Sequence, residues 1–165
     1  MLQGRSSEIH KLNEFFERKE SNIVILYGYE YAGISSLWRE FAKGKDAVYL
    51  SAVPATEREQ AYLWAKHLNW DEKIPIDYSY KTVFHSVISA KDPHKPDKKL
   101  LIIDQFHYLC SKENTFFEEL HDFMDVSDGE DSCMFLLMSH HVNYVENTFS
   151  SWMRDYHLKP AGYLY

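Results

Sequence analysis

Residues 26–41, LYGYEYAGISSLWREF, join an apolar segment to an amphipathic one through a loop bounded by Gly28 and Gly33. The residues before the loop, 22–28 (NIVILYG), form a short continuous apolar run, which is typical of a β-strand buried on both faces. Apolar residues after the loop recur at i, i+3, i+4 and i+7 and predict a helix, whose inner face carries Ile34, Leu37, Trp38 and Phe41. This order is the frame of the phosphate-binding motif G-x-x-x-x-G-K-[ST], with Ile34 in the place of its lysine.

Other apolar runs and amphipathic segments alternate along the rest of the chain. Strands are predicted at residues 47–52, 100–104 and 134–139, with a short fifth strand in 156–165. Helices are predicted before the first strand and between the later ones, one of them starting at a capping box formed by Thr56 and Glu59. Continuous apolar strands alternating with helices predict a parallel sheet covered on both faces. With no internal repeat or long linker, residues 1–165 are expected to form one α/β domain.

Composition limits the classes of function. A formal charge of −7 argues against non-specific binding to nucleic acid, so nucleic acid is not expected as a partner of this domain alone. No signal peptide or membrane-spanning run is evident, which favours a soluble cytoplasmic protein. Cys110 and Cys133 follow no metal-binding spacing, and free thiols or a single disulfide are both compatible with the sequence.

The loop itself is the first candidate site. In such a loop, backbone N–H groups and the dipole of the helix N-terminus hold phosphate oxygens, and the glycines supply unusual dihedral angles. Ser35 stands where the motif's hydroxyl coordinates Mg²⁺. The alternative is a tight strand-to-helix turn without a ligand. The candidate nucleotide-binding residues of this segment are Gly28, Tyr29, Glu30, Tyr31, Ala32, Gly33, Ile34, Ser35 and Ser36.

A second candidate lies at residues 99–109, KLLIIDQFHYL. An apolar strand that ends in Asp104 matches a Walker B strand, whose aspartate holds Mg²⁺ directly or through water. The order of the two motifs strengthens both, since a strand ending in aspartate is common by itself. Asp104 and Ser35 are therefore the predicted Mg²⁺ ligands.

Taken together, these segments resemble the archaeal-type P-loop ATPases, relatives of the AAA+ and STAND proteins. The family's GRxxEhxxL, YGRRRVGKTSL, YFSA and VIDEFPYL motifs match GRSSEIHKL at 4–12, LYGYEYAGISSL at 26–37, VYLSA at 48–52 and IIDQFHYL at 102–109. HLKP at 157–160 is similar to the family's LKPL. The resemblance implies a three-layer fold with strand order 5-1-4-3-2, and a chain without the family's helical lid and C-terminal domain. It also implies that Ser139, at the end of the fourth strand, reads the γ-phosphate, and that Arg154 is a weak candidate for a trans-acting arginine finger.

The departures from this family decide the expected activity. Ile34 replaces the lysine that reaches the β- and γ-phosphates, which should weaken nucleotide binding by about ten- to a hundredfold. Glu30 adds a negative charge at the loop tip. Gln105 replaces the glutamate that accepts a proton from the attacking water, and an amide cannot do this. Slow or absent ATP hydrolysis is therefore predicted.

Three hypotheses remain open from the sequence. The first is a degenerate P-loop domain that binds ATP or ADP weakly with Mg²⁺ and acts through a protein partner or self-association. The second is a pure interaction module with an empty phosphate loop; Ile34 and Glu30 favour it, whereas the retained Gly28, Gly33, Ser35 and Asp104 oppose it. The third is an active ATPase completed by a residue from another subunit.

Overall fold

The computed structural model of the chain describes residues 6–29, 33–68, 79–90, 92–95, 98–110, 115–126, 132–149 and 162–164. Of the candidate site residues, Glu30, Tyr31, Ala32 and Arg154 lie outside these ranges.

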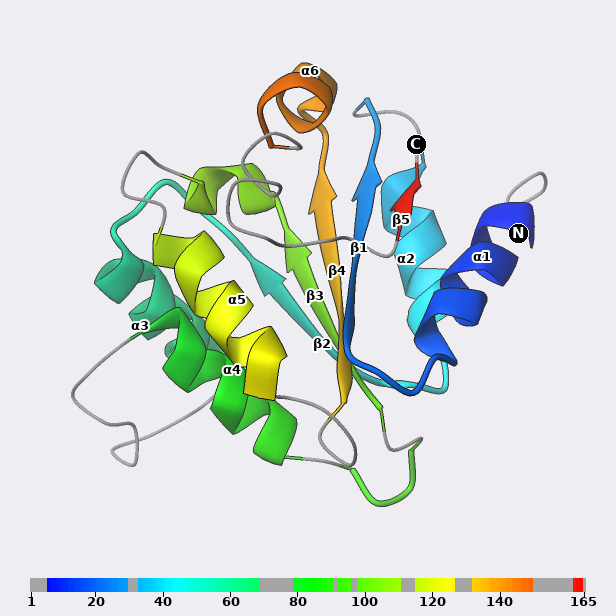
Figure 1. Cartoon of the computed structure of the whole chain (residues 1–165), viewed down its shortest axis with the longest axis horizontal. Coiled ribbons are helices and arrows are strands. Elements are labelled where there is room, and N and C mark those ends of the chain that lie inside the picture. The colour runs from blue at the N-terminus through cyan, green and yellow to red at the C-terminus, as the bar shows by residue number, and fades with distance from the viewer. Residues whose placement is uncertain are drawn as a thin grey trace.

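One parallel sheet organises the fold (Figure 1). Its long strands lie in the order β1-β4-β3-β2 and span Asn22–Tyr27, Cys133–Ser139, Lys99–Asp104 and Asp46–Ser51. Each neighbouring pair is parallel. The parallel α/β architecture and the strand order 1-4-3-2 are thus confirmed. On the other side of β1, the described part of the sheet ends in the short strand β5 (Gly162–Leu164), which pairs with β1 in parallel at the place expected for the short fifth strand.

Helices cover both faces of the sheet (Figure 1). On one face lie α1 (Ser6–Phe16) and α2 (Ile34–Ala42). On the other lie α3 (Glu57–His67), α4 (Tyr80–Ser89) and α5 (Thr115–Val126). Shorter elements follow β3 and β4: the 3₁₀ helix η1 (Phe106–Leu109), α6 (Val142–Tyr144) and the π-helical turn η3 (Val145–Phe149). Within the described residues, no helix has the length and apolar character needed to cross a bilayer.

The strands alternate between two apolar cores with a period of two residues. In β1, Ile23 and Ile25 face α3–α5, whereas Val24 and Leu26 face α1 and α2. The same alternation holds in β3 and β4, whose apolar side chains are almost all below 2% exposed. Burial on both faces explains why these strands read as continuous apolar runs.

Local capping signals set the ends of two helices. The predicted capping box begins α3: Thr56 Oγ1 accepts from Glu59 N at 3.2 Å, and Thr56 N donates to Glu59 Oε2 at 3.4 Å. Gly44, with φ of 78°, lies two residues beyond the end of α2 and lets the chain turn toward β2.

A buried ion pair ties β2 to β3 at the end of the sheet opposite the strand C-termini. Lys99 Nζ lies 2.7 Å from Asp46 Oδ1 and 3.0 Å from Ala90 O, and the Lys99 side chain is 4% exposed. The second oxygen of Asp46 accepts from Asp92 N at 3.0 Å. The pair therefore joins two strands and the segment after α4.

We expect Asp46→Ala to lower the free energy of unfolding by about 3–5 kcal/mol, because it leaves the Lys99 ammonium buried without its counter-charge. Urea denaturation followed by circular dichroism measures this loss. The matched control is Glu40→Ala, which breaks the exposed Lys43–Glu40 pair (2.7 Å) and should barely move the midpoint. Equal effects of the two substitutions would contradict the assignment.

Candidate functional site

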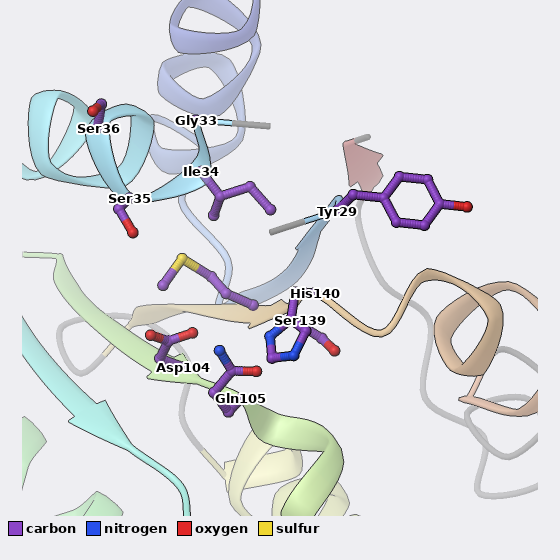
Figure 2. A pocket seen from close by; sticks show the side chains of 10 residues that line it. Tyr29, Gly33, Ile34, Ser35, Ser36, Asp104, Gln105, Ser139 and His140 are labelled. Atoms are coloured by element: carbon purple, nitrogen blue, oxygen red, sulfur yellow. The ribbon is translucent and has the colours of Figure 1, made fainter. Parts of the chain in front are cut away.

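The C-terminal ends of β1, β3 and β4 lie at one edge of the sheet, facing the start of α2. A pocket of about 310 Å³ opens there, and its described lining consists of Tyr29, Gly33, Ile34, Ser35, Ser36, Asp104, Gln105, Met138, Ser139 and His140 (Figure 2). The structure thus brings together residues from both sequence motifs and from the end of β4. This volume is at the lower end of the range for small-molecule sites.

The first turn of α2 forms one wall of the pocket. Gly33 is the N-cap residue in the left-handed conformation (φ 81°, ψ 19°), and Leu37 N donates to its carbonyl at 3.1 Å. No side chain caps this helix, and the first N–H groups of an α-helix have no partner within it. In Figure 2 the Ser35 hydroxyl points into the pocket toward Asp104, while Ser36 points away. Free amides and the helix dipole make this turn suitable for an anion.

Gly28 continues the sheet and does not have the loop conformation that was expected for it. Its N–H donates to the carbonyl of Ser139 at 3.2 Å, which extends the β1–β4 ladder by one residue. Of the two glycines, only Gly33 has a positive φ, so the expectation that both supply unusual dihedral angles is wrong for Gly28. The Gly28 N–H is therefore used in the hydrogen bonding of the sheet. The Tyr29 side chain, 60% exposed, points away from the other labelled side chains (Figure 2).

The position of the motif's lysine is apolar in this structure. Ile34 is partly buried and packs against the core cluster beneath α1 and α2, which includes Met138. Met138 is 1% exposed and also lines the pocket. No lysine or arginine is found in the described lining. The pocket therefore offers an anion backbone amides and hydroxyls, without a fixed cationic side chain.

Asp104 makes a contact that the sequence motifs did not suggest. Its Oδ2 accepts a hydrogen bond from the Tyr49 hydroxyl at 2.5 Å. Tyr49 comes from β2 and stacks on Trp38 of α2, with ring centroids 4.7 Å apart and an interplanar angle of 15°. Burial, together with the neighbouring Asp104 carboxylate, raises the pKa of Tyr49 to about 12. The phenol is therefore a neutral donor to Asp104 at physiological pH.

Gln105, at the position of the catalytic glutamate, lines the pocket in a strained conformation. Among the described residues other than glycine, Gln105 is the one with a positive φ, of 57°. Its carbonyl accepts from Tyr108 N at 3.1 Å, which starts η1. The Oε1 atom is buried and has no hydrogen-bond partner among the described residues. Such strained residues cluster at functional sites, where the surroundings hold them in place.

Two histidines form hydrogen bonds with the Ser139 hydroxyl. Its Oγ accepts from His141 N at 3.0 Å and lies 2.9 Å from His107 Nδ1. The His107 ring stacks on that of His141 at 3.9 Å, and His140 lies close by. Burial, with smaller contributions from His141 and His140, lowers the pKa of His107 to about 4. Ser139 is thus held by a neutral imidazole at neutral pH, and any contact with a ligand has to compete with that bond.

Sequence reasoning missed three of these participants. Tyr49 and Met138 lie in ordinary strand patterns, and neither carries a sequence signal for its role. His107 follows Asp104 by three residues, and only the η1 turn brings its ring to Ser139.

Comparisons with known proteins agree with this geometry at the level of the fold. A Walker-type ATPase of Pyrococcus abyssi is similar over 99% of this chain, with a TM-score of 0.70 and 16% identity. Cdc6p of Pyrobaculum aerophilum (TM-score 0.62, 13% identity) and a structure of Drosophila ORC bound to DNA (0.65, 15%) also match over 99%. The chain spans 53%, 45% and 42% of the length of these three chains, respectively. No model of a known family and no curated protein matches the sequence. The domain therefore shares its fold with these proteins.

The His107 environment predicts a pH dependence of stability. Because the folded pKa of about 4 lies below the ordinary value of 6.5, the unfolded chain binds a proton between these pH values that the native state does not. This contribution is complete above pH 6.5 and is lost as the pH falls toward 4. The free energy of unfolding of the wild type should therefore fall more steeply over this range than that of His107→Asn.

Urea denaturation at intervals from pH 7 to pH 4 measures the difference between the two slopes. His67→Asn, which replaces an exposed histidine at the end of α3, controls for the loss of an imidazole. Parallel curves for wild type and His107→Asn would refute the prediction.

Proposed function

We propose that this chain is a P-loop ATPase-like domain that binds the phosphates of ATP or ADP weakly and hydrolyses ATP slowly or not at all. The observation that carries the proposal is the convergence of the α2 N-terminus, Asp104 and Ser139 on one pocket. The amides of the first turn of α2 would hold a phosphate group, with Gly33 allowing the close approach of the backbone.

Weak binding follows from what surrounds the phosphate position. A lysine would contribute charge-assisted hydrogen bonds worth about 1.5–3 kcal/mol, and Ile34 contributes none. Asp104 adds a negative charge to the lining, balanced in part by the hydrogen bond from Tyr49. The backbone is thus left as the main source of affinity.

The chemistry of the donor set fits Mg²⁺ only in part. Ser35 and Asp104 both line the pocket and are the oxygen ligands that would hold the ion beside a bound nucleotide. When bound, the ion would neutralise phosphate charge. One carboxylate oxygen of Asp104 is already engaged by Tyr49, however, which leaves a single oxygen on this residue.

Slow hydrolysis follows from Gln105. The residue lines the pocket beside Asp104, but its amide has no basic site that could take a proton from water at neutral pH. In this role Gln105 can orient a water molecule without activating it.

A protein partner or self-association is the mode of action that we propose for the domain. Two of the solved structures with this fold, of ORC bound to DNA and of ORC bound to AT-rich DNA and Cdc6, are protein assemblies on DNA. The charge of −7 does not favour DNA contact by this domain itself.

The second candidate function is an interaction module whose pocket stays empty. The packing of Ile34 into the core favours it, since this side chain contributes to stability without a ligand. A thermal-shift series with ADP and ATP separates the two functions. A rise in melting temperature at millimolar nucleotide supports binding, and an unchanged melting temperature supports the module.

Ile34→Lys should tighten ADP binding by about ten- to a hundredfold, because it returns an ammonium to the phosphate position. Isothermal titration calorimetry measures the affinity. Ile34→Met is the matched control, since it has similar length without charge and should leave the affinity near the wild-type value. Equal affinities for the lysine and methionine variants would contradict the placement of phosphate at the start of α2.

Gln105→Glu in the Ile34→Lys background should raise ATP turnover by about 10²–10⁴-fold, because the carboxylate can accept the proton of the attacking water. Phosphate release measures turnover. Gln105→Asn in the same background controls for the change in shape and should stay inactive. If the glutamate variant binds ATP and turnover does not rise, Gln105 does not occupy the position of the base.

A further inference from the structure

The hydrogen bond between Tyr49 and Asp104 is set by the register of two strands. Tyr49 lies opposite Ile102 in the β2–β3 pair, and Ile102 and Asp104 point to the same face of the sheet because they are two residues apart. Tyr49 is therefore the diagonal neighbour of Asp104 on the face that carries α2, within reach of a long aromatic side chain. The observed distance of 2.5 Å is that of a charge-assisted bond to a carboxylate.

Trp38 fixes Tyr49 from the opposite side. Its stacked ring limits the rotation of the phenol, and Trp38 lies one helical turn after Ile34 on α2. Ile34, Trp38 and Tyr49 all pack against the same core cluster. The aromatic pair thus connects the helix that forms one wall of the pocket with the carboxylate in the other wall, through side chains of the protein alone.

In a P-loop site, the hydroxyl at the start of α2 and the aspartate at the end of β3 would hold Mg²⁺, which would supply positive charge there. Mg²⁺ gives up its water reluctantly, so it usually retains several waters and is held by one or two carboxylates together with substrate phosphates. Here the only carboxylate in the described lining, Asp104, accepts a hydrogen bond from Tyr49 at one oxygen, and the lining also includes the apolar Ile34 and Met138. These features reduce what the site offers to a divalent cation.

We propose that the Tyr49 hydroxyl takes the place of the metal as the partner of Asp104, so that the pocket holds its anion through backbone amides without a divalent cation. The part concerning the anion rests on the proposed function; the part concerning the metal does not. Tyr49 is then a positioning residue that makes the site independent of Mg²⁺.

Tyr49 could instead help Asp104 to bind a metal, and this role predicts the opposite effect of removing its hydroxyl. Donors to a metal-binding carboxylate often orient it and strengthen metal binding. If Tyr49 oriented Asp104 for Mg²⁺, its loss would weaken metal binding. If it replaces the metal, its loss should strengthen metal binding.

The first experiment titrates the protein with Mn²⁺ alone, as a spectroscopic substitute for Mg²⁺, and measures free Mn²⁺ by electron paramagnetic resonance. The wild type should not bind Mn²⁺ measurably at millimolar concentration, and Tyr49→Phe should bind about ten- to a hundredfold more tightly. Tyr62→Phe, at an exposed position of α3, is the matched control and should behave as wild type. Adding Asp104→Asn to Tyr49→Phe should abolish the new binding.

Two results of this titration would overturn the proposal. One is Mn²⁺ binding by the wild type that weakens in Tyr49→Phe, since Tyr49 would then orient a metal ligand. The other is an absence of binding in both proteins, since Tyr49 would then not be what excludes the metal. Circular dichroism confirms that the variant is folded; if it is not, Mn²⁺ binding by the wild type alone still overturns the proposal.

The second experiment measures ADP affinity of the wild type in EDTA and in Mg²⁺ by calorimetry. The two affinities should agree within about twofold, whereas Tyr49→Phe should bind ADP about tenfold more tightly with Mg²⁺ than without it. Strong Mg²⁺ dependence in the wild type would overturn the inference. If ADP does not bind under any condition, the proposed function fails, and the Mn²⁺ titration still decides the role of Tyr49.

Discussion

The parallel hydrogen-bond register of β1, β4 and β3 is the constraint on which the pocket depends. It pairs Tyr27 with Ser139 and Asp104 with Met138, so that three strands end at the same edge of the sheet. Side chains alternate between the two faces, so a slip of one residue in β3 would turn Asp104 away from α2 and toward α3–α5. The two apolar cores prevent such a slip, because it would exchange every buried side chain of the strand.

The same core that fixes the register also reaches into the pocket. Ile34 and Met138 belong to or pack against the cluster beneath α1 and α2 while facing the space where a phosphate would lie. A lysine at position 34 would have to remain hydrated or be paired with an anion, because an unpaired buried charge is costly. With isoleucine, packing adds to the backbone hydrogen bond from Leu37 N to Gly33 O in stabilising the first turn of α2. The domain therefore does not require a ligand to complete its structure at this point.

The polar half of the pocket is organised differently, through hydrogen bonds from uncharged side chains of the protein. The Tyr49 phenol forms a hydrogen bond with Asp104, and the His107 imidazole forms one with Ser139. Both side chains are uncharged near physiological pH. Burial is the main cause in each case: it raises the pKa of Tyr49 and lowers the pKa of His107. Both Asp104 and Ser139 therefore have hydrogen-bond partners within the protein. Gln105, which lines the same pocket, keeps one buried acceptor without a hydrogen-bond partner among the described residues.

The amino-acid sequence by itself determined the parallel α/β architecture, the strand order 1-4-3-2, the capping box at Thr56 and the meeting of Gly33, Ser35, Asp104 and Ser139. The parallel architecture and the capping box follow from hydrophobic periodicity and a short motif, which are local properties of the chain. The strand order and the place of Ser139 beside the loop were implied by the resemblance to the P-loop ATPases. Only the tertiary structure decided that Gly28 serves the sheet, that β5 is a three-residue edge, and that Tyr49 and His107 hold Asp104 and Ser139. The reason is that these contacts join residues 55 and 32 positions apart, and their existence depends on strand register and on a 3₁₀ turn, neither of which is encoded in a local pattern.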